Sequence, residues 1–64
     1  MTFIEYLNRH RVRMASRMLA ESDAAIVDIG NACGFESLSY FYKRFRQIAG
    51  LPPRAWRLKR AGGR

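Results

Sequence analysis

Residues 26–48 read IVDIGNACGFESLSYFYKRFRQI, which has the pattern of two helices separated by a sharp turn. In the first part Ile26, Ile29 and Cys33 recur at helical spacing, and Gly34 then breaks the run. In the second part the apolar residues fall on one face of a second helix. These residues are Leu38, Phe41, Phe45 and Ile48. The stretch therefore predicts an all-α fold organised around a helix-turn-helix pair.

The second helix of this pair should begin near Ser37, with Glu36 or Ser37 as its N-cap, and Gly50 should end it. Leu38 lies at the edge of the apolar stripe, where core packing is favoured over contact with a thymine methyl group. The opposite face carries one hydroxyl and two cations: Ser39, Lys43 and Arg46. An apolar inner face and a polar, basic outer face suit a helix that lies in the major groove of DNA.

The N-terminal end of such a helix usually points into the groove, so the residues there are candidates for base contacts. The candidates are Ser39, Tyr42 and Lys43, with Tyr40 as a further, ambiguous one. Either tyrosine could instead pack partly in the core with its hydroxyl in water. Arg44 lies nearer the core edge and should reach back to phosphate or to an acidic side chain. The expected contacts to the DNA backbone are Arg44, Arg46, Ser37 and Arg54.

Two glycines shape the crossing of the helix pair, whose first helix should run from about 24 to 33. Gly30 lies inside this helix and weakens it by about 1 kcal/mol relative to Ala, which indicates the close approach of another helix. Gly34 stands where a helix C-cap needs a left-handed residue. Phe35 follows it and is placed to fill the angle between the two helices.

A longer helix should come first in the chain. Thr2 and Glu5 have the spacing of a capping box, and neither Gly nor Pro interrupts the segment up to Ala20. A polar break follows, in which Ser22 or Asp23 is the expected N-cap of the next helix.

The apolar residues of the long helix form two stripes. One stripe holds Phe3, Ile4, Leu7, Met14 and Met18, and the other holds Val12, Ala15 and Leu19. One interpretation is a single broad core face that wraps around the helix. The other is a connecting helix that serves two packing units, of which only residues 22–64 are present. Phe3, Tyr6 and Leu7 would then face a partner outside this chain.

The last part of the chain should close the core. Leu51 and the two prolines after it form a turn, and Pro53 can take the first position of a short helix expected from about 54 to 59. Trp56 should pack back onto the helix pair, and stacking of an exposed Trp on a base is less favoured. Residues 59–64 are expected to form a disordered basic tail.

The net charge of +7 is placed unevenly along the 64 residues, which allow one domain at most. Residues 1–36 carry four arginines and five acids, whereas residues 37–64 carry eight basic residues and no acid. Such a half-chain is an electrostatic footprint for a polyanion. A solvated basic surface and a membrane-binding basic peptide are alternatives. The caps and glycines argue against the peptide, because they specify a folded helix pair.

The sequence contains no pattern typical of an enzyme, a metal site or a cofactor site. Cys33 and His10 are the only residues of their types and lie far apart in sequence. The single cysteine, expected to be buried, fits a reducing cytosol. No apolar run approaches the roughly 20 residues that span a bilayer. We therefore expect no catalysis, no cofactor and no membrane association.

These residues together resemble the AraC/XylS family of bacterial transcription regulators. Three sets carry the resemblance. The first matches the linker helix of the family: Phe3-Ile4-Glu5-Tyr6-Leu7, Arg11, Ala15 and Leu19. The second matches the first helix and turn of its second helix-turn-helix: Ile26, Ile29 and Gly34-Phe35. The third matches its recognition helix and closing segment: Ser39-Tyr40-Phe41, Arg44-Phe45, Gly50-Leu51-Pro52-Pro53 and Trp56-Arg57. Gly30 departs from the usual Ala of the family, and Trp56 from its common Tyr.

The resemblance implies a division into a linker helix (1–21), a second helix-turn-helix subdomain with its closing helix (22–58) and a tail (59–64). The chain would then be a fragment that lacks the first of the two helix-turn-helix subdomains of the family. The implied function is sequence-specific binding of double-stranded DNA by a recognition helix at about 37–49, in the bacterial cytoplasm at the nucleoid.

Two kinds of protein partner also follow from the resemblance. The missing subdomain, or another copy of the chain, would cover the N-terminal half of the long helix. RNA polymerase subunits are further partners that the family suggests. The alternative function is a non-catalytic protein–protein module that uses the stripe of Phe3, Tyr6 and Leu7.

Overall fold

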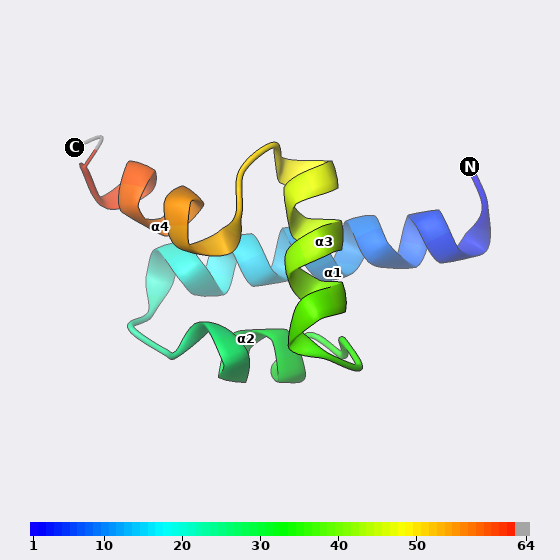
Figure 1. Cartoon of the computed structure of the whole chain (residues 1–64), viewed down its shortest axis with the longest axis horizontal. Helices are drawn as coiled ribbons and strands as arrows, with labels where there is room; N and C mark the ends of the chain where they lie inside the picture. Colours follow the sequence, from blue (N-terminus) through cyan, green and yellow to red (C-terminus); the bar gives the residue numbers. More distant parts are fainter. Residues whose placement is uncertain (63–64) are drawn as a thin grey trace.

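The computed structural model describes residues 1–62, which form four helices joined by short turns (Figure 1). They are α1 (Phe3–Glu21), α2 (Ile26–Ala32), α3 (Leu38–Ala49) and α4 (Pro53–Gly62). α1 runs along the long axis of the molecule, and the other three helices all pack against it. The described residues contain no strand, so the prediction of an all-α fold with a long first helix is confirmed.

α1 begins with the predicted capping box. The side chain of Thr2 accepts a hydrogen bond from the backbone N–H of Glu5 at 3.1 Å, and the backbone N–H of Thr2 donates to the Glu5 carboxylate at 3.2 Å. Ser22 closes the other end, where its backbone N–H donates to the carbonyl of Met18. The buried residues of α1 recur every three or four positions: Asn8, Val12, Ala15 and Leu19.

The N-terminal end of α1 projects beyond the other helices (Figure 1). Phe3, Ile4 and Tyr6 at this end are 73%, 57% and 62% exposed. Of the two stripes, the one through Val12 lies in the core, and the one through Phe3 is largely open, although Met18 at its far end packs against the core. The structure therefore favours two separate stripes over one broad core face.

α2 begins later than expected. We expected a start near Ala24 with Ser22 or Asp23 as the N-cap, but the N-cap is Ala25, which makes no side-chain hydrogen bond. The reason is that the Ser22 hydroxyl is used elsewhere. It donates to the carbonyl of Met18 at 2.8 Å and accepts from the N–H of Ala24 at 3.3 Å. Ser22 therefore ends α1 and turns the chain before α2 can start.

The crossing of α2 and α3 follows the two predicted glycines. A β-carbon on Gly30 would lie 2.8 Å from Cδ2 of Phe41, so α3 approaches α2 at a point where only glycine fits without movement. Gly34 has a φ of +92° and turns the chain after α2. Phe35 is buried beside it, and its ring centroid lies 4.9 Å from that of Phe41. The predicted plug between the two helices is confirmed.

α3 has the caps that its sequence predicts. The side chain of Ser37 accepts from the N–H of Tyr40, which decides between the two expected N-caps, and Gly50 ends the helix with a φ of +89°. Phe41 and Phe45 are fully buried, whereas Leu38 is 45% exposed. The expectation that Leu38 favours the core is therefore wrong, because its side chain lines a surface pocket with Ser39 and Tyr42 and does not join the core cluster.

α4 begins at Pro53, as expected, but continues to Gly62 instead of ending near 59. The physical reason is that Arg57 and the four residues after it are adequate helix formers, and Gly62 is the first weak one. Residues 59–62 are thus helical and not part of a disordered tail, and residues 63–64 lie outside the described part of the chain. Trp56 closes the core as predicted, with its ring edge-on to Phe45 at a centroid distance of 6.1 Å.

Candidate nucleic-acid interface

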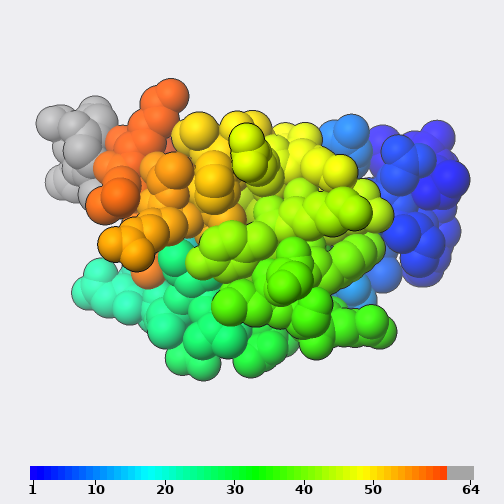
Figure 2. Space-filling view, in the orientation of Figure 1, coloured from blue at the N-terminus to red at the C-terminus, as the bar shows by residue number. Residues whose placement is uncertain are grey.

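α3 lies across one broad face of the molecule, where its atoms cover the centre of the view in Figure 2. Its buried face holds Phe41 and Phe45, both without solvent exposure. Its outward face is exposed and carries one hydroxyl and two cations, Ser39, Lys43 and Arg46, with the exposed amide of Gln47 at the edge nearest α1. The aromatic cluster beneath fixes the rotation of α3, because turning the helix would bring polar side chains into the core.

Gln47 is the residue of this face that sequence reasoning missed. It follows Lys43 by about one helical turn, so its exposed position at the edge of this face could be predicted from the spacing. The structure adds that it lines a pocket together with Glu5 and Arg9 of α1. Gln47 was not among the predicted contacts because its amide carries no charge. An amide can nevertheless donate hydrogen bonds to base edges and accept them.

Tyr42 lies on the flank of α3 that faces α4. The Tyr42 ring is half-buried and stands edge-on to Phe41, with centroids 6.1 Å apart. Together with Leu38 and Ser39 it lines a shallow surface pocket at the start of α3. A second shallow pocket joins Tyr42 to Arg54 in the first turn of α4. The structure thus brings Tyr42 next to Ser39 and Arg54, as an interface would require.

Tyr40 lies on the other flank of α3, which faces α1. Its hydroxyl accepts a hydrogen bond from the side-chain amide of Asn8 at 3.0 Å. The guanidinium of Arg44 stacks over its ring at 5.2 Å from the centroid. The donated hydrogen bond from Asn8, and then the proximity of Arg44, lower the pKa of Tyr40 below its ordinary value. The structure does not bring Tyr40 together with Ser39 and Lys43.

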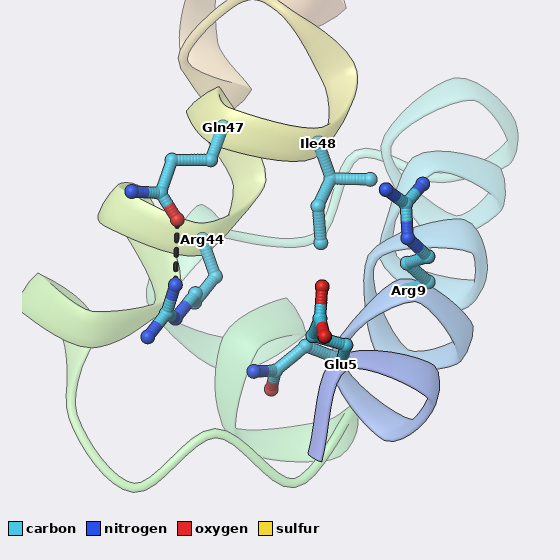
Figure 3. A pocket seen from close by; sticks show the side chains of 6 residues that line it. Glu5, Arg9, Arg44, Gln47 and Ile48 are labelled. Carbon is cyan, nitrogen blue, oxygen red and sulfur yellow. Dashed lines mark hydrogen bonds between the residues drawn. The ribbon is translucent and has the colours of Figure 1, made fainter. Parts of the chain in front are cut away.

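Arg44 occupies the same flank as Tyr40. One terminal nitrogen of its guanidinium donates to the side-chain oxygen of Gln47 at 2.7 Å. Its Nε atom is buried and has no hydrogen-bond partner within the described residues. Figure 3 shows this guanidinium beside a pocket that Glu5 and Arg9 of α1 also line. No hydrogen bond in the described residues joins Arg44 to an acid, so the expected partner of that kind is absent there.

The other two expected backbone contacts lie at helix starts. Ser37 accepts from the N–H of Tyr40 as the N-cap of α3, which leaves its hydroxyl proton free to donate. Arg54 is exposed in the first turn of α4. Both side chains are therefore available to a phosphate.

The remaining chemistry of the described residues is sparse. In residues 1–62 no group of three or more His, Cys, Asp or Glu side chains is placed to hold a metal ion. Cys33 is buried, and this burial raises the pKa of its thiol. His10 is exposed on α1. None of the four helices, as far as they are described, is long and apolar enough to cross a membrane.

The described residues form four helices, and two of these are a pair joined at a glycine turn. The second helix of the pair has an exposed basic face. These features define a helix-turn-helix domain. A family model described as a helix-turn-helix domain matches residues 1–59. The chain belongs to the AraC-type helix-turn-helix family of transcription regulators. This family is not a class of enzymes. The resemblance stated from the sequence is confirmed.

Several relatives of known description are similar to most of this chain. The HTH-type transcriptional activator RhaS of Pectobacterium carotovorum is 40% identical over 57 residues, which cover 89% of this chain and 20% of that protein. The HTH-type transcriptional regulator ArgR of Pseudomonas aeruginosa is 36% identical over 69 residues, 95% of this chain and 21% of that protein. The chain thus spans about a fifth of the length of these relatives.

A solved structure is similar in both fold and sequence. A protein of unknown function from Listeria innocua superposes with a TM-score of 0.88 at 31% identity, over 91% of this chain and 55% of that chain. The arrangement of the helices is therefore one that a longer protein also contains.

Proposed function

We propose that this domain binds double-stranded DNA sequence-specifically with α3 in the major groove, as part of a bacterial transcription regulator. One observation carries the proposal: Phe41 and Phe45 are fully buried while the opposite face of the same helix is exposed and basic. A helix held on this side by a rigid core can enter a groove with its other side. The regulator names of the relatives support the same role.

The exposed side chains divide into base readers and phosphate binders. Ser39 and Lys43 lie in the first half of α3 and would read base edges, with Tyr42 beside them. The backbone contacts would come from three groups at the edges of this face, Ser37, Arg46 and Arg54. Tyr40 and Arg44 are left out, because both face α1.

The test is binding of fluorescent duplexes, after selection of a preferred sequence from a random duplex pool. We expect a preferred duplex to bind more tightly than a scrambled one, with affinity that falls as salt rises. Binding by one helix-turn-helix alone should be weak, because the interface is small. Equal affinity for preferred and scrambled duplexes would remove the proposal.

A control variant must separate the effect of net charge on binding from the effect of the α3 face. Arg17 is exposed on α1, opposite the buried side of that helix, so Arg17→Ala removes one charge away from α3. This variant should keep the preference for the selected duplex, whereas Lys43→Ala should lose part of it.

A regulator of this kind would act in the bacterial cytoplasm at the nucleoid, and RNA polymerase would be a second partner. These two proposals rest on the family alone. Footprints on a promoter containing the selected sequence, with and without polymerase, would test the second proposal, since a binding partner would extend or strengthen protection. Fluorescence microscopy of the tagged chain in bacterial cells would test the first.

A protein–protein module is the second candidate, and the exposed stripe of α1 favours it. Phe3 and Tyr6 are mostly exposed, and Leu7 is half-buried between them and the core. Exposed aromatic side chains grouped on one helix are typical of a surface that a partner covers. Sedimentation equilibrium tests pairing of copies through this stripe: self-association that Phe3→Ser abolishes would support it, and a monomer at high concentration would exclude it.

A further inference from the structure

A chain of polar contacts crosses from α1 to the outward face of α3. It starts at Asn8, which is only 5% exposed and is the one buried polar side chain among the described residues. The Asn8 amide donates to the Tyr40 hydroxyl at 3.0 Å. Arg44 stacks on the Tyr40 ring and donates to Gln47 at 2.7 Å. Four side chains thus connect the core side of α1 to an exposed amide at the edge of the interface nearest α1.

We propose that Arg44 is a positioning residue, which holds Gln47 in one orientation and fixes α3 against α1, and does not bind DNA phosphate. The proposal rests on the proposed function, since the orientation of Gln47 matters only if α3 reads DNA. It reverses the role that the sequence predicted for this arginine.

The surroundings of the guanidinium support a structural use. One side of it is stacked on an aromatic ring, one terminal nitrogen is bonded to Gln47, and Nε is buried. In Figure 3 α1 stands across the pocket from Arg44 and contributes Glu5 and Arg9 to its lining. The lining from α1 thus supplies one carboxylate and one guanidinium, so this pocket is not a purely cationic site for a phosphate. The outward cations Lys43 and Arg46 have no such cover.

Asn8, at the other end of this series of contacts, makes the connection between α1 and α3 rigid. A buried amide costs free energy unless it is hydrogen-bonded, so Asn8 holds the Tyr40 hydroxyl in place. Tyr40 in turn presents a fixed ring for the planar guanidinium of Arg44, an arrangement that lysine cannot reproduce. Groups that hold a binding residue in place in this way affect the accuracy of recognition more than they affect the charge of the binding site.

The experiment compares Arg44 with Arg46, its exposed neighbour on the same helix. We would measure binding of the full chain to the selected duplex and to duplexes with single base-pair changes, over a range of salt. Arg46→Met should flatten the dependence of log affinity on log salt by about 0.9. Arg44→Met should leave this slope unchanged and should reduce the preference for the selected duplex by about fivefold.

Two further variants separate positioning from charge. Arg44→Lys keeps the charge but loses the stacked fork, so we expect it to lose preference as Arg44→Met does. Asn8→Ala changes no charge, yet should cause the same loss at an unchanged salt slope. Wild-type behaviour of Arg44→Lys, or a slope for Arg44→Met that falls as far as that of Arg46→Met, would overturn the proposal.

A measurement without DNA distinguishes this proposal from the proposed function. In the free protein the side-chain amide signals of Gln47 should show restricted motion, and Arg44→Met should release it while circular dichroism shows the helices intact. If the wild type shows no sequence preference, the proposed function fails, whatever Gln47 does. If Gln47 is equally mobile in both proteins, the positioning link itself fails.

Discussion

Gly30 of α2 and Phe41 of α3 are in contact so closely that a β-carbon at position 30 would lie 2.8 Å from Cδ2 and 3.1 Å from Cγ of the ring. Phe41 is fully buried against Phe35 and Phe45, so its ring cannot move aside freely. The glycine at position 30, where the family usually has Ala, therefore leaves room for the Phe41 ring of the aromatic cluster. The packing of α2 against α3 therefore depends on the contact between Gly30 and Phe41.

Replacement of Gly30 by Ala should therefore destabilise the fold. The added methyl group overpacks the core at a cost of about 2 kcal/mol, and better helix propensity returns about 1 kcal/mol. We expect the free energy of unfolding, measured with urea, to fall by about 1 kcal/mol. Asn31→Ala on the exposed side of α2 is the control and should stabilise slightly. A gain for Gly30→Ala equal to that of the control would contradict the close contact.

Arg57 should be a major support of the fold, because it caps the end of α1 from α4. Its guanidinium donates to the carbonyls of Leu19 at 3.2 Å and Ser22 at 3.1 Å. The last turn of α1 has no basic residue of its own. Arg57→Ala should lower the free energy of unfolding by about 2 kcal/mol, measured by thermal or urea unfolding. Arg54→Ala, an exposed change in the same helix, should stay within about 0.5 kcal/mol of the wild type.

Lys43 and Arg46 should affect DNA binding in different ways. Lys43→Ala should relax the preference at one or two base pairs, by about fivefold, because it removes contacts to base edges. Arg46→Ala should weaken all duplexes about equally and flatten the salt dependence, because it removes a phosphate contact. Duplex titrations at several salt concentrations measure both effects. Identical behaviour of the two variants would show that the division of roles is wrong.

Tyr40 should make stability depend on pH at the alkaline end. Because its pKa is lowered in the folded state from the ordinary value of 10.0, the unfolded chain binds more protons between the two values. Stability contributed by Tyr40 is therefore fully present above 10.0 and is lost as the pH falls through the folded pKa. Relative to Tyr40→Phe, the free energy of unfolding of the wild type should rise over this window.

The cause of this pH effect can be checked directly. Phenolate absorbance, measured in a Tyr6→Phe/Tyr42→Phe background, reports Tyr40 alone. Adding Asn8→Ala should move its pKa back towards 10.0, because the donated hydrogen bond from Asn8 is the largest cause of the lowered pKa. An unchanged titration in that variant would mean that Asn8 does not contact the phenol in solution.

Local patterns in the sequence were sufficient for most of the fold. The capping box at Thr2, the glycines at 34 and 50 and the proline at 53 each act on the backbone within a few residues of themselves. Their effect is independent of distant packing, so the existence of the helix pair, the turn at Gly34 and both ends of α3 could be predicted from them. The start of α2 was missed because Ser22 has two possible local uses, and only the structure shows that it closes α1.

The candidate site was only partly predictable for a related reason. Helical periodicity placed Ser39, Lys43 and Arg46 on one face, and all three are exposed there. It could not tell on which side of that face α1 would lie. Tyr40 and Arg44 therefore received roles in DNA binding, although the structure turns both towards α1.

Capping, glycine turns and periodicity are local, so the residue pattern alone predicts a long helix followed by a helix-turn-helix pair with a basic outward face. Three features depend on the packing of the helices: which stripe of α1 is buried, the hydrogen bond from Asn8 to Tyr40, and the capping of α1 by Arg57, 38 residues after Leu19. The physical reason is that the rotation of one helix against another depends on how side chains distant in sequence fill a common core.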